Sequence, residues 1–189
     1  MHARERPRGL RGRSPEADRR TGPTATIRTA ANADAGPIAA IYKQGIAERQ
    51  ATFETDERSS AEVVGWLGRE REPVLVAELD SRVAGFARVI QSSDRCAYAG
   101  VGEYAIYLDR TARGQGVGAR LLEELAMAAE RAGYWKLIGK LFTTNAASIA
   151  LAGRCGFRAV GVHERHGRLD GEWKDLLVVE RLLGEAVDG

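Results

Sequence analysis

A glycine-rich stretch in the second half of the chain constrains the fold most. Residues 113–119 read Arg-Gly-Gln-Gly-Val-Gly-Ala and separate the apolar run 104–108 from a helix-like run that begins at Val117. In a turn between a strand and a helix, successive backbone N–H groups point to one place, and the helix N-terminus favours an anion there. The stretch therefore predicts a strand, a turn and a helix around a site for a phosphate-bearing ligand.

Three kinds of glycine loop compete for this stretch. A P-loop requires Gly-Lys followed by Ser or Thr, and the chain contains no Lys-Ser or Lys-Thr pair. A dinucleotide loop requires a third glycine and an acidic residue about 20 positions further on. Leu121 occupies the position of that glycine, and residues 133–136 contain no acid. The spacing that remains is Arg-x-x-Gly-x-Gly-Ala from Arg113, with a plain surface turn as the simpler alternative.

Hydrophobic periodicity predicts strands and helices along most of the chain. Asp34 is expected to cap the first helix, and Ser59 or Ser60 to open a second that runs through Leu67. Strands are expected at 25–30, 74–79, 83–91, 101–108, 136–142, 157–163 and 173–182, and later helices from 117 to about 132 and at 145–154. The order βααβββαβαββ is neither a regular βαβ alternation nor an all-β pattern. It predicts a single α/β domain whose mixed sheet carries helices on both faces.

The N-terminal segment differs in charge from the rest of the chain. Residues 1–22 carry seven Arg and three acidic residues, a net charge of +4, whereas the whole chain carries +2. The remainder is therefore slightly acidic and has no basic stripe, which argues against a nucleic-acid partner. We expect 1–22 to be a disordered Arg-rich extension, 23–184 to be the folded domain and 185–189 to be a tail.

Composition places the chain among folded intracellular proteins. Apolar residues make up 44% of it, and no apolar run approaches the ~20 residues of a membrane span. Cys96 and Cys155 lie far apart and form no metal-ligand spacing, so a reduced pair is expected. We expect a cytoplasmic protein with no metal and no membrane contact.

Glu103 is the first candidate for chemistry, because it lies ten residues before Arg113 in the strand that leads into the glycine loop. Strand alternation puts Glu103 on one face with Ala105 and Tyr107. A carboxylate beside a bound ligand can accept a proton from the group that reacts with that ligand. The alternative is a strand glutamate that faces solvent or pairs with an arginine.

The residues together resemble one enzyme family. The glycine spacing is similar to the acyl-coenzyme A loop of the GCN5-related N-acetyltransferases (GNAT), and the element order resembles that family over about 25–183. Further motifs resemble its phosphinothricin N-acetyltransferase branch: Arg95 and Tyr98 before the strand glutamate, Phe-Glu-Thr at 53–55 and Gly-Glu-Trp-Lys-Asp at 171–175. The segment 164–171 is similar to arsinothricin N-acetyltransferases.

The resemblance implies a set of functional residues. Glu103 would be the general base. Backbone groups of Ile106, Tyr107 and Leu108 would pair with the pantetheine arm of acetyl-CoA like an added strand. Backbone N–H groups would bind the pyrophosphate from Arg113, Gly114, Gln115, Gly116, Val117, Gly118 and Ala119. Asn145 matches an asparagine that contacts the cofactor at the next helix start, with an ordinary N-cap as the alternative.

Four residues are expected on the acceptor side. Arg95 suits a substrate carboxylate, because a guanidinium binds one through two hydrogen bonds. Phe53, Tyr98 and Trp173 are expected to wall the pocket. A surface arginine and ordinary core aromatics are the alternatives.

The chain departs from the family pattern at one position. Many relatives carry a tyrosine seven residues after the asparagine, where it protonates the leaving thiolate, and here that position is Ala152. Tyr107 and Cys155 are candidates to protonate the leaving thiolate in place of that tyrosine. His163 and His166 are expected near the acceptor end, where one of them could hold or shuttle a proton.

The sequence thus predicts an N-acetyltransferase that moves acetyl from acetyl-CoA to the amino group of a small amino-acid antimetabolite and so confers resistance. Phosphinothricin or arsinothricin is the expected acceptor, and methionine sulfoximine is another. A homodimer is expected from the family habit. Two alternatives stay open: a GNAT enzyme for a different amine, such as a protein N-terminus, and a non-catalytic acyl-CoA-binding module, which would not need Glu103.

Overall fold

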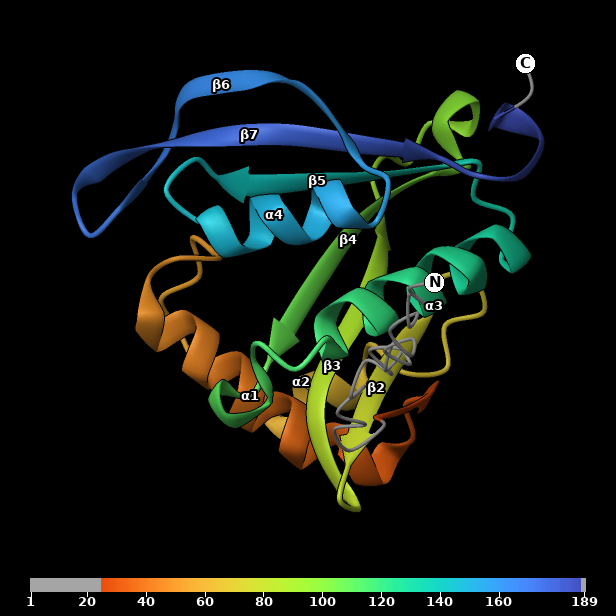
Figure 1. Ribbon diagram of the computed structural model, residues 1–189, viewed down its shortest axis with the longest axis vertical. Coiled ribbons are helices and arrows are strands. Elements are labelled where there is room, and N and C mark those ends of the chain that lie inside the picture. Colours follow the sequence, from red (N-terminus) through yellow and green to blue (C-terminus); the bar gives the residue numbers. More distant parts are fainter. Residues whose placement is uncertain (1–24, 188–189) are drawn as a thin grey trace, which may run out of the picture.

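One seven-stranded mixed sheet forms the centre of the molecule, seen in a computed structural model that describes residues 25–187 (Figure 1). The strand order is β1-β2-β3-β4-β5-β7-β6, and neighbours are antiparallel except β4 and β5. The strands are β1 Thr26–Thr29, β2 Val74–Leu79, β3 Arg82–Gln91, β4 Val101–Leu108, β5 Lys136–Phe142, β6 Arg158–Leu169 and β7 Glu172–Leu182. This confirms the predicted element order and the mixed sheet. The predicted extension 1–22 lies outside the described residues.

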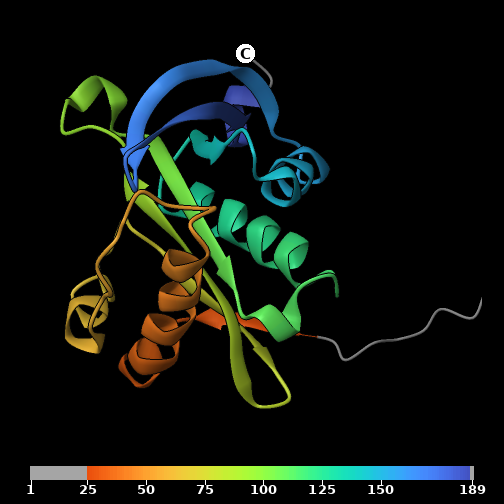
Figure 2. The ribbon, with the colours of Figure 1, turned by 90° about the vertical axis from the view of Figure 1, so that its left-hand side faces the viewer.

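Helices cover both faces of the sheet, as predicted. They are α1 Ala35–Glu48, α2 Ser60–Val64, α3 Val117–Arg131 and α4 Ala146–Arg154. Figure 2 shows α1 and α2 on one side of the strands and α3 and α4 on the other. Short 3-10 turns precede α1 and the glycine loop, and another, Cys96–Tyr98, precedes β4.

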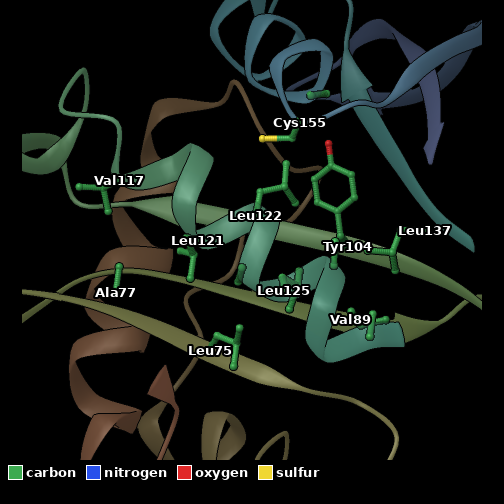
Figure 3. Close-up of a cluster of buried hydrophobic side chains, with 14 of the residues drawn as sticks. Leu75, Ala77, Val89, Tyr104, Val117, Leu121, Leu122, Leu125, Leu137 and Cys155 are labelled. Atoms are coloured by element: carbon green, nitrogen blue, oxygen red, sulfur yellow. The ribbon is translucent and has the colours of Figure 1, made fainter. Parts of the chain in front are cut away.

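The larger core lies under α3. Leu121, Leu122 and Leu125 are fully buried against Val89 of β3 and Leu137 of β5, and Figure 3 shows them among side chains of the sheet. Apolar residues spaced by four along this helix are all buried: Val117, Leu121, Leu125 and Ala129. Because these side chains fix α3 to the sheet, they also fix the start of α3, where the glycine loop ends.

A second core lies under α1 and α2. Ile38, Val63 and Phe86 are buried there, and Tyr42 meets Phe86 edge-on with 6.1 Å between ring centroids. Tyr107 of β4 stacks on Phe86 at 5.3 Å. This face therefore contains a row of aromatic rings next to the strand that carries Glu103.

Two predicted boundaries were wrong. Helix α2 ends at Val64 rather than Leu67, because Gly65 follows it and a turn with positive φ (74°) at Gly68 leads away. Strand β6 runs on to Leu169 through a segment predicted to be a connection. Its residues are mostly exposed, so they lack apolar alternation, yet the backbone pairs with β7 up to a tight turn at Asp170 and Gly171.

Asp34 occupies the N-cap position of α1, as predicted, but its side chain does not cap that helix. The Asp34 carboxylate makes no capping bond to α1. It accepts hydrogen bonds from the Arg28 guanidinium at 2.7 and 2.9 Å and from the backbone N–H of Ala31 at 2.8 Å. Asp34 is only 5% exposed, and the Arg28 hydrogen bonds hold its pKa below the usual value. The carboxylate thus ties β1 to the segment that enters α1.

Asp34→Asn tests this tie. At pH 7 we expect the free energy of unfolding to fall by about 1–3 kcal/mol, because the variant loses a charge-assisted contact with a half-exposed arginine. The depressed pKa makes this stabilisation complete above the unfolded carboxyl value of about 3.9, and it is lost as the pH falls further. Urea titrations should therefore show a gap between wild type and variant that narrows below pH ~4. Asp56→Asn, at an exposed site, is the control; a gap that persists at low pH would contradict the assignment.

Candidate active site

Strands β4 and β5 pair with each other only over their first three residues, and beyond these they separate to form a fork. They pair in parallel only from Val101 to Glu103 and from Lys136 to Ile138, whereas β4 stays paired with β3 as far as Leu108. The edge of β4 from 104 to 108 therefore has no strand partner on the β5 side, and Figure 1 shows the two strands diverging. The predicted pantetheine-binding residues Ile106, Tyr107 and Leu108 lie on this free edge.

A cavity of about 530 Å³ opens at the fork. We call it the fork cavity. Its walls come from β4, β5, the segment after α1, the start of α4 and the β6–β7 hairpin. Among the residues that line it are Phe53, Glu103, Ile106, Tyr107, Lys140, Asn145 and His166. Predicted residues that are distant in sequence are thus brought together here.

The glycine loop has the backbone geometry that an anion site requires. Gly114 and Gly116 have φ of 75° and 80°, a region that side chains rarely adopt, and open space surrounds both Cα atoms. Gly116 is the residue before α3, so the first-turn N–H groups of this 15-residue helix have no carbonyl partners within the helix. The loop can therefore receive a phosphate, as its sequence predicts.

The side chains of the loop hold it in shape. The Arg113 guanidinium donates to the Leu108 carbonyl at 3.1 and 3.3 Å and forms an ion pair with Glu48 of α1 at 3.0 Å. Gln115 donates to the Thr111 carbonyl at 2.6 Å. Arg113 therefore ties the loop to the end of β4 and to α1. Its own backbone N–H donates to the Arg110 carbonyl at 3.5 Å, so the loop N–H groups that can meet a ligand are those that follow Arg113.

The start of α3 packs closely on the end of β4. Val117 is buried, and a Cβ on Gly118 would lie 3.1 Å from a methyl carbon of Leu108. Ala119 is half-buried, and its carbonyl accepts a weak bond from the Cys155 thiol at 3.7 Å. The small residues at 118 and 119 allow the helix start to lie next to the free edge of β4.

Glu103 lies at the point where the fork opens. Its carboxylate meets the Lys140 ammonium of β5 at 2.7 Å, and about a third of each side chain is exposed. The charged partner is a lysine rather than the arginine considered in the sequence. The ion pair keeps the carboxylate inside the fork cavity, where a single proton transfer could reach a bound amine.

Strand alternation in β4 follows the prediction. Tyr107 faces the α1 side and Tyr104 faces the opposite side, where it meets Phe157 at 4.9 Å. Burial, followed by the neighbouring Tyr42, raises the pKa of Tyr107. Its hydroxyl is therefore protonated throughout the physiological range.

A second cavity, of about 430 Å³, adjoins the first on the α1 and α2 side. We call it the acceptor cavity. Five residues line both cavities: Tyr42, Glu54, Ile90, Ala105 and Tyr107. The shared wall means that a molecule in the acceptor cavity lies next to the fork.

Arg88 of β3 is the functional candidate that sequence reasoning missed. Its side chain is only 11% exposed, it lines the acceptor cavity, and its guanidinium lies over the Trp66 ring at 4.3 Å. Among residues 25–187, its Nε finds no hydrogen-bond partner, and the nearest carboxylate, Glu72, is 3.9 Å away. Desolvation lowers the pKa of Arg88. The available signal was a lone arginine inside the otherwise apolar strand 83–90.

The predicted acceptor residues are only partly brought together. Phe53 lines the fork cavity and meets Phe142 edge-on at 4.9 Å. Arg95 and Tyr98 are exposed in the loop before β4 and stack on each other at 5.3 Å. Trp173 is 52% exposed and is covered by Arg168 at 4.2 Å. Arg95, Tyr98 and Trp173 line neither cavity, because their segments lie outside the fork.

Asn145 acts as the N-cap of α4. Its Oδ1 accepts from the Ser148 backbone N–H at 3.0 Å, and its Nδ2 donates to the Gln50 carbonyl at 2.9 Å. The N-cap alternative is thus confirmed, while contact with a cofactor stays a prediction. Ala152 is fully buried in the core, so its side chain does not reach the fork cavity.

The other candidate proton carriers differ in position. Burial raises the pKa of the Cys155 thiol, which therefore stays protonated. His166 lines the fork cavity, and the His163 ring lies beside it at 5.0 Å. His166 is thus the histidine that the fold brings to Glu103's cavity.

Residues 25–187 contain neither a candidate membrane span nor a candidate metal site. Within this part of the chain no helix has the length and apolar character to cross a membrane. No group of three or more His, Cys, Asp or Glu side chains there is arranged to hold a metal ion.

Comparison with known proteins identifies the family. Residues 41–157 match the profile of the Acetyltransferase (GNAT) family. The chain is 32% identical to the phosphinothricin N-acetyltransferase of Alcaligenes faecalis, over 84% of this chain and 82% of the relative. It is 30% identical to the L-methionine sulfoximine/L-methionine sulfone acetyltransferase of Pseudomonas paraeruginosa, over 83% and 94%.

Comparison with solved structures supports the same family assignment. The fold matches a GNAT superfamily phosphinothricin acetyltransferase from Sinorhizobium meliloti, solved in complex with acetyl-CoA, with a TM-score of 0.81 and 33% identity over 88% of this chain and 92% of that one. The forked sheet and the glycine loop are thus those of a fold that binds acetyl-CoA in a relative. The chain belongs to the GNAT family and is an acetyl-CoA-dependent N-acetyltransferase related to phosphinothricin and methionine sulfoximine acetyltransferases.

Proposed function

We propose that this enzyme acetylates the α-amino group of a small amino-acid antimetabolite, of the phosphinothricin, arsinothricin or methionine sulfoximine kind, and so confers resistance to it. One observation carries the proposal: the adjoining cavities hold a carboxylate at the fork, Glu103, and a buried guanidinium with an unsatisfied Nε, Arg88. An α-amino acid presents an amine and a carboxylate a few ångströms apart, which suits a base and a cation on two sides of a shared wall.

The fork and the glycine loop would hold acetyl-CoA. The free edge of β4 at 106–108 offers backbone groups to the pantetheine arm, and the N–H groups of 114–119 suit the pyrophosphate. Asn145 lines the same cavity. Acetyl-CoA supplies the activated acetyl group as a thioester.

Glu103 would act as the general base. Its carboxylate takes one proton from the acceptor ammonium, so that the nitrogen lone pair can attack the thioester carbonyl and form the new N–C bond. The C–S bond then breaks and the thiolate leaves, while the nitrogen gives up its second proton to the thiolate or to water to yield the neutral amide. A backbone N–H near Tyr107 would stabilise the oxyanion formed on the way. Lys140 would hold the carboxylate in place until the amine arrives.

Arg88 would bind the carboxylate of the acceptor. The guanidinium lies in the cavity wall, 4.3 Å from the centroid of the Trp66 ring, and a guanidinium can donate two parallel hydrogen bonds to a carboxylate. Phe53 would border the acceptor at the fork. Arg95, Tyr98 and Trp173, predicted for the same task, would need a rearrangement of their segments to reach it.

The cellular setting is proposed on general grounds. A cytoplasmic location matches the supply of acetyl-CoA, and a homodimer is the common assembly of the family. Neither is needed for the geometry of the two cavities. The first test is a thioester-release assay with acetyl-CoA and a panel of amino-acid antimetabolites; if no amino acid is acetylated while another amine is, the proposal fails.

Glu103→Gln tests the base. We expect kcat to fall by about 10²–10⁴-fold, because an amide cannot accept the proton, while acetyl-CoA affinity measured by calorimetry changes little. Glu57→Gln, at an exposed site in the segment before α2, is the matched control. Turnover equal to that of wild type would remove Glu103 from this role.

Arg88→Met tests the carboxylate site. Loss of a charge-assisted contact worth about 1.5–3 kcal/mol should raise the acceptor KM by about 10–100-fold and leave the acetyl-CoA KM unchanged. Thermal melting checks that the variant is folded. Arg95→Ala is the comparison: if Arg95→Ala raises the acceptor KM and Arg88→Met does not, the carboxylate belongs to Arg95 instead.

A further inference from the structure

We propose that the preferred acceptor has an uncharged side chain, of the sulfone or sulfoximine type, rather than an anionic phosphinate or arsinate. This inference rests on the proposed function and narrows its substrate class. It comes from the ion pairs around the two cavities, which determine how many anionic groups an acceptor can carry.

Arg58 is already neutralised. It lines the acceptor cavity, but its guanidinium meets Glu54 at 2.6 Å and Glu62 at 3.1 Å, and both glutamates line the same cavity. Glu62 is held in turn by Ser59, whose backbone N–H and hydroxyl both donate to it. An anionic ligand would have to compete with two fixed carboxylates for Arg58.

Arg69 is occupied as well. Its guanidinium meets Glu72 at 3.1 Å and donates to the Gly65 carbonyl at 3.0 Å. At the fork, Lys140 is held by Glu103 at 2.7 Å. The other basic side chain there is His166.

Arg88 is therefore the one arginine or lysine lining the described cavities that lacks a carboxylate within ordinary hydrogen-bond distance. Arg88 can bind one anionic group, and in the proposed complex that group is the α-carboxylate of the acceptor. A second anionic group would enter a cavity in which every other arginine and lysine already pairs with a carboxylate. Burying a charge without a partner is strongly unfavourable.

The other residues that line the acceptor cavity suit an uncharged side chain. Tyr42, Trp66 and Phe86 supply aromatic surface, and Ile90 lies between the two cavities two residues beyond Arg88. Glu54 also lines both cavities and would repel an anion placed at their junction. A methylsulfonyl group has polar oxygens but no net charge, so it meets apolar walls at a smaller desolvation penalty.

A matched pair of substrates tests the effect of the side-chain charge of the acceptor alone. Methionine sulfone and phosphinothricin have nearly the same shape, since a methylsulfonyl group in one replaces a methylphosphinate in the other, and they differ by one negative charge. We expect kcat/KM for L-methionine sulfone to exceed that for L-phosphinothricin by at least about tenfold. An equal value, or a preference for phosphinothricin, would overturn the inference while leaving the proposed function intact.

Glu54→Gln tests whether the ion pairs are the cause. This variant removes a negative charge from the junction and releases part of Arg58, so the preference for the sulfone should fall by at least about threefold. Glu57→Gln is the matched control, because Glu57 lies in the same segment, pairs with Lys43 at 2.8 Å and lines neither cavity. An unchanged preference in Glu54→Gln would overturn the charge argument. Failure to acetylate either substrate, with activity on an unrelated amine, would instead overturn the proposed function.

Discussion

The separation of β4 from β5 is the constraint on which the rest of the site depends. It begins directly after the pairing of Glu103 with Ile138, and the local packing suggests its cause. Tyr104 follows Glu103, and a Cβ on Gly139 would lie 2.5–2.8 Å from the Tyr104 ring and hydroxyl. The ring thus occupies the space above β5 at the first unpaired position. A glycine on β5 and an aromatic residue on β4 together stabilise a sheet that is open at one end.

The opening of the sheet determines where charge can be placed. Glu103 and Lys140 face each other across the fork as an ion pair, whereas Arg88 lies one strand away, against the Trp66 ring in the turn that follows α2. The other arginines of that cavity have carboxylate partners nearby. The molecule therefore tolerates one incompletely paired buried cation next to the Glu103–Lys140 pair, and such a group usually marks a binding function rather than a contribution to stability.

Much of the fold could be predicted because it follows local periodicity. The apolar line of α3 and the alternation of β4 depend on neighbouring residues alone, and so does the positive φ that glycines allow in the loop. The boundary of β6 could not be predicted, because an exposed edge strand needs no apolar alternation. The role of Asp34 depended on Arg28, whose approach follows from tertiary structure. Arg88 was missed for the same reason: its lack of a full partner is a property of the packed cavity, whereas Arg95 attracted notice by its spacing.

The long hairpin of β6 and β7 has a consequence for aggregation. β6 forms one edge of the sheet and is exposed along most of its 12 residues, so its backbone offers a template to other chains. Its register with β7 is interrupted between Ala159 and Gly161 and again between His163 and Gly167, and charged side chains at 158, 164, 165 and 168 line the strand. Such breaks and charges prevent a straight strand from adding along the whole edge. The hairpin can therefore extend into solvent without becoming a seed for edge-to-edge polymerisation.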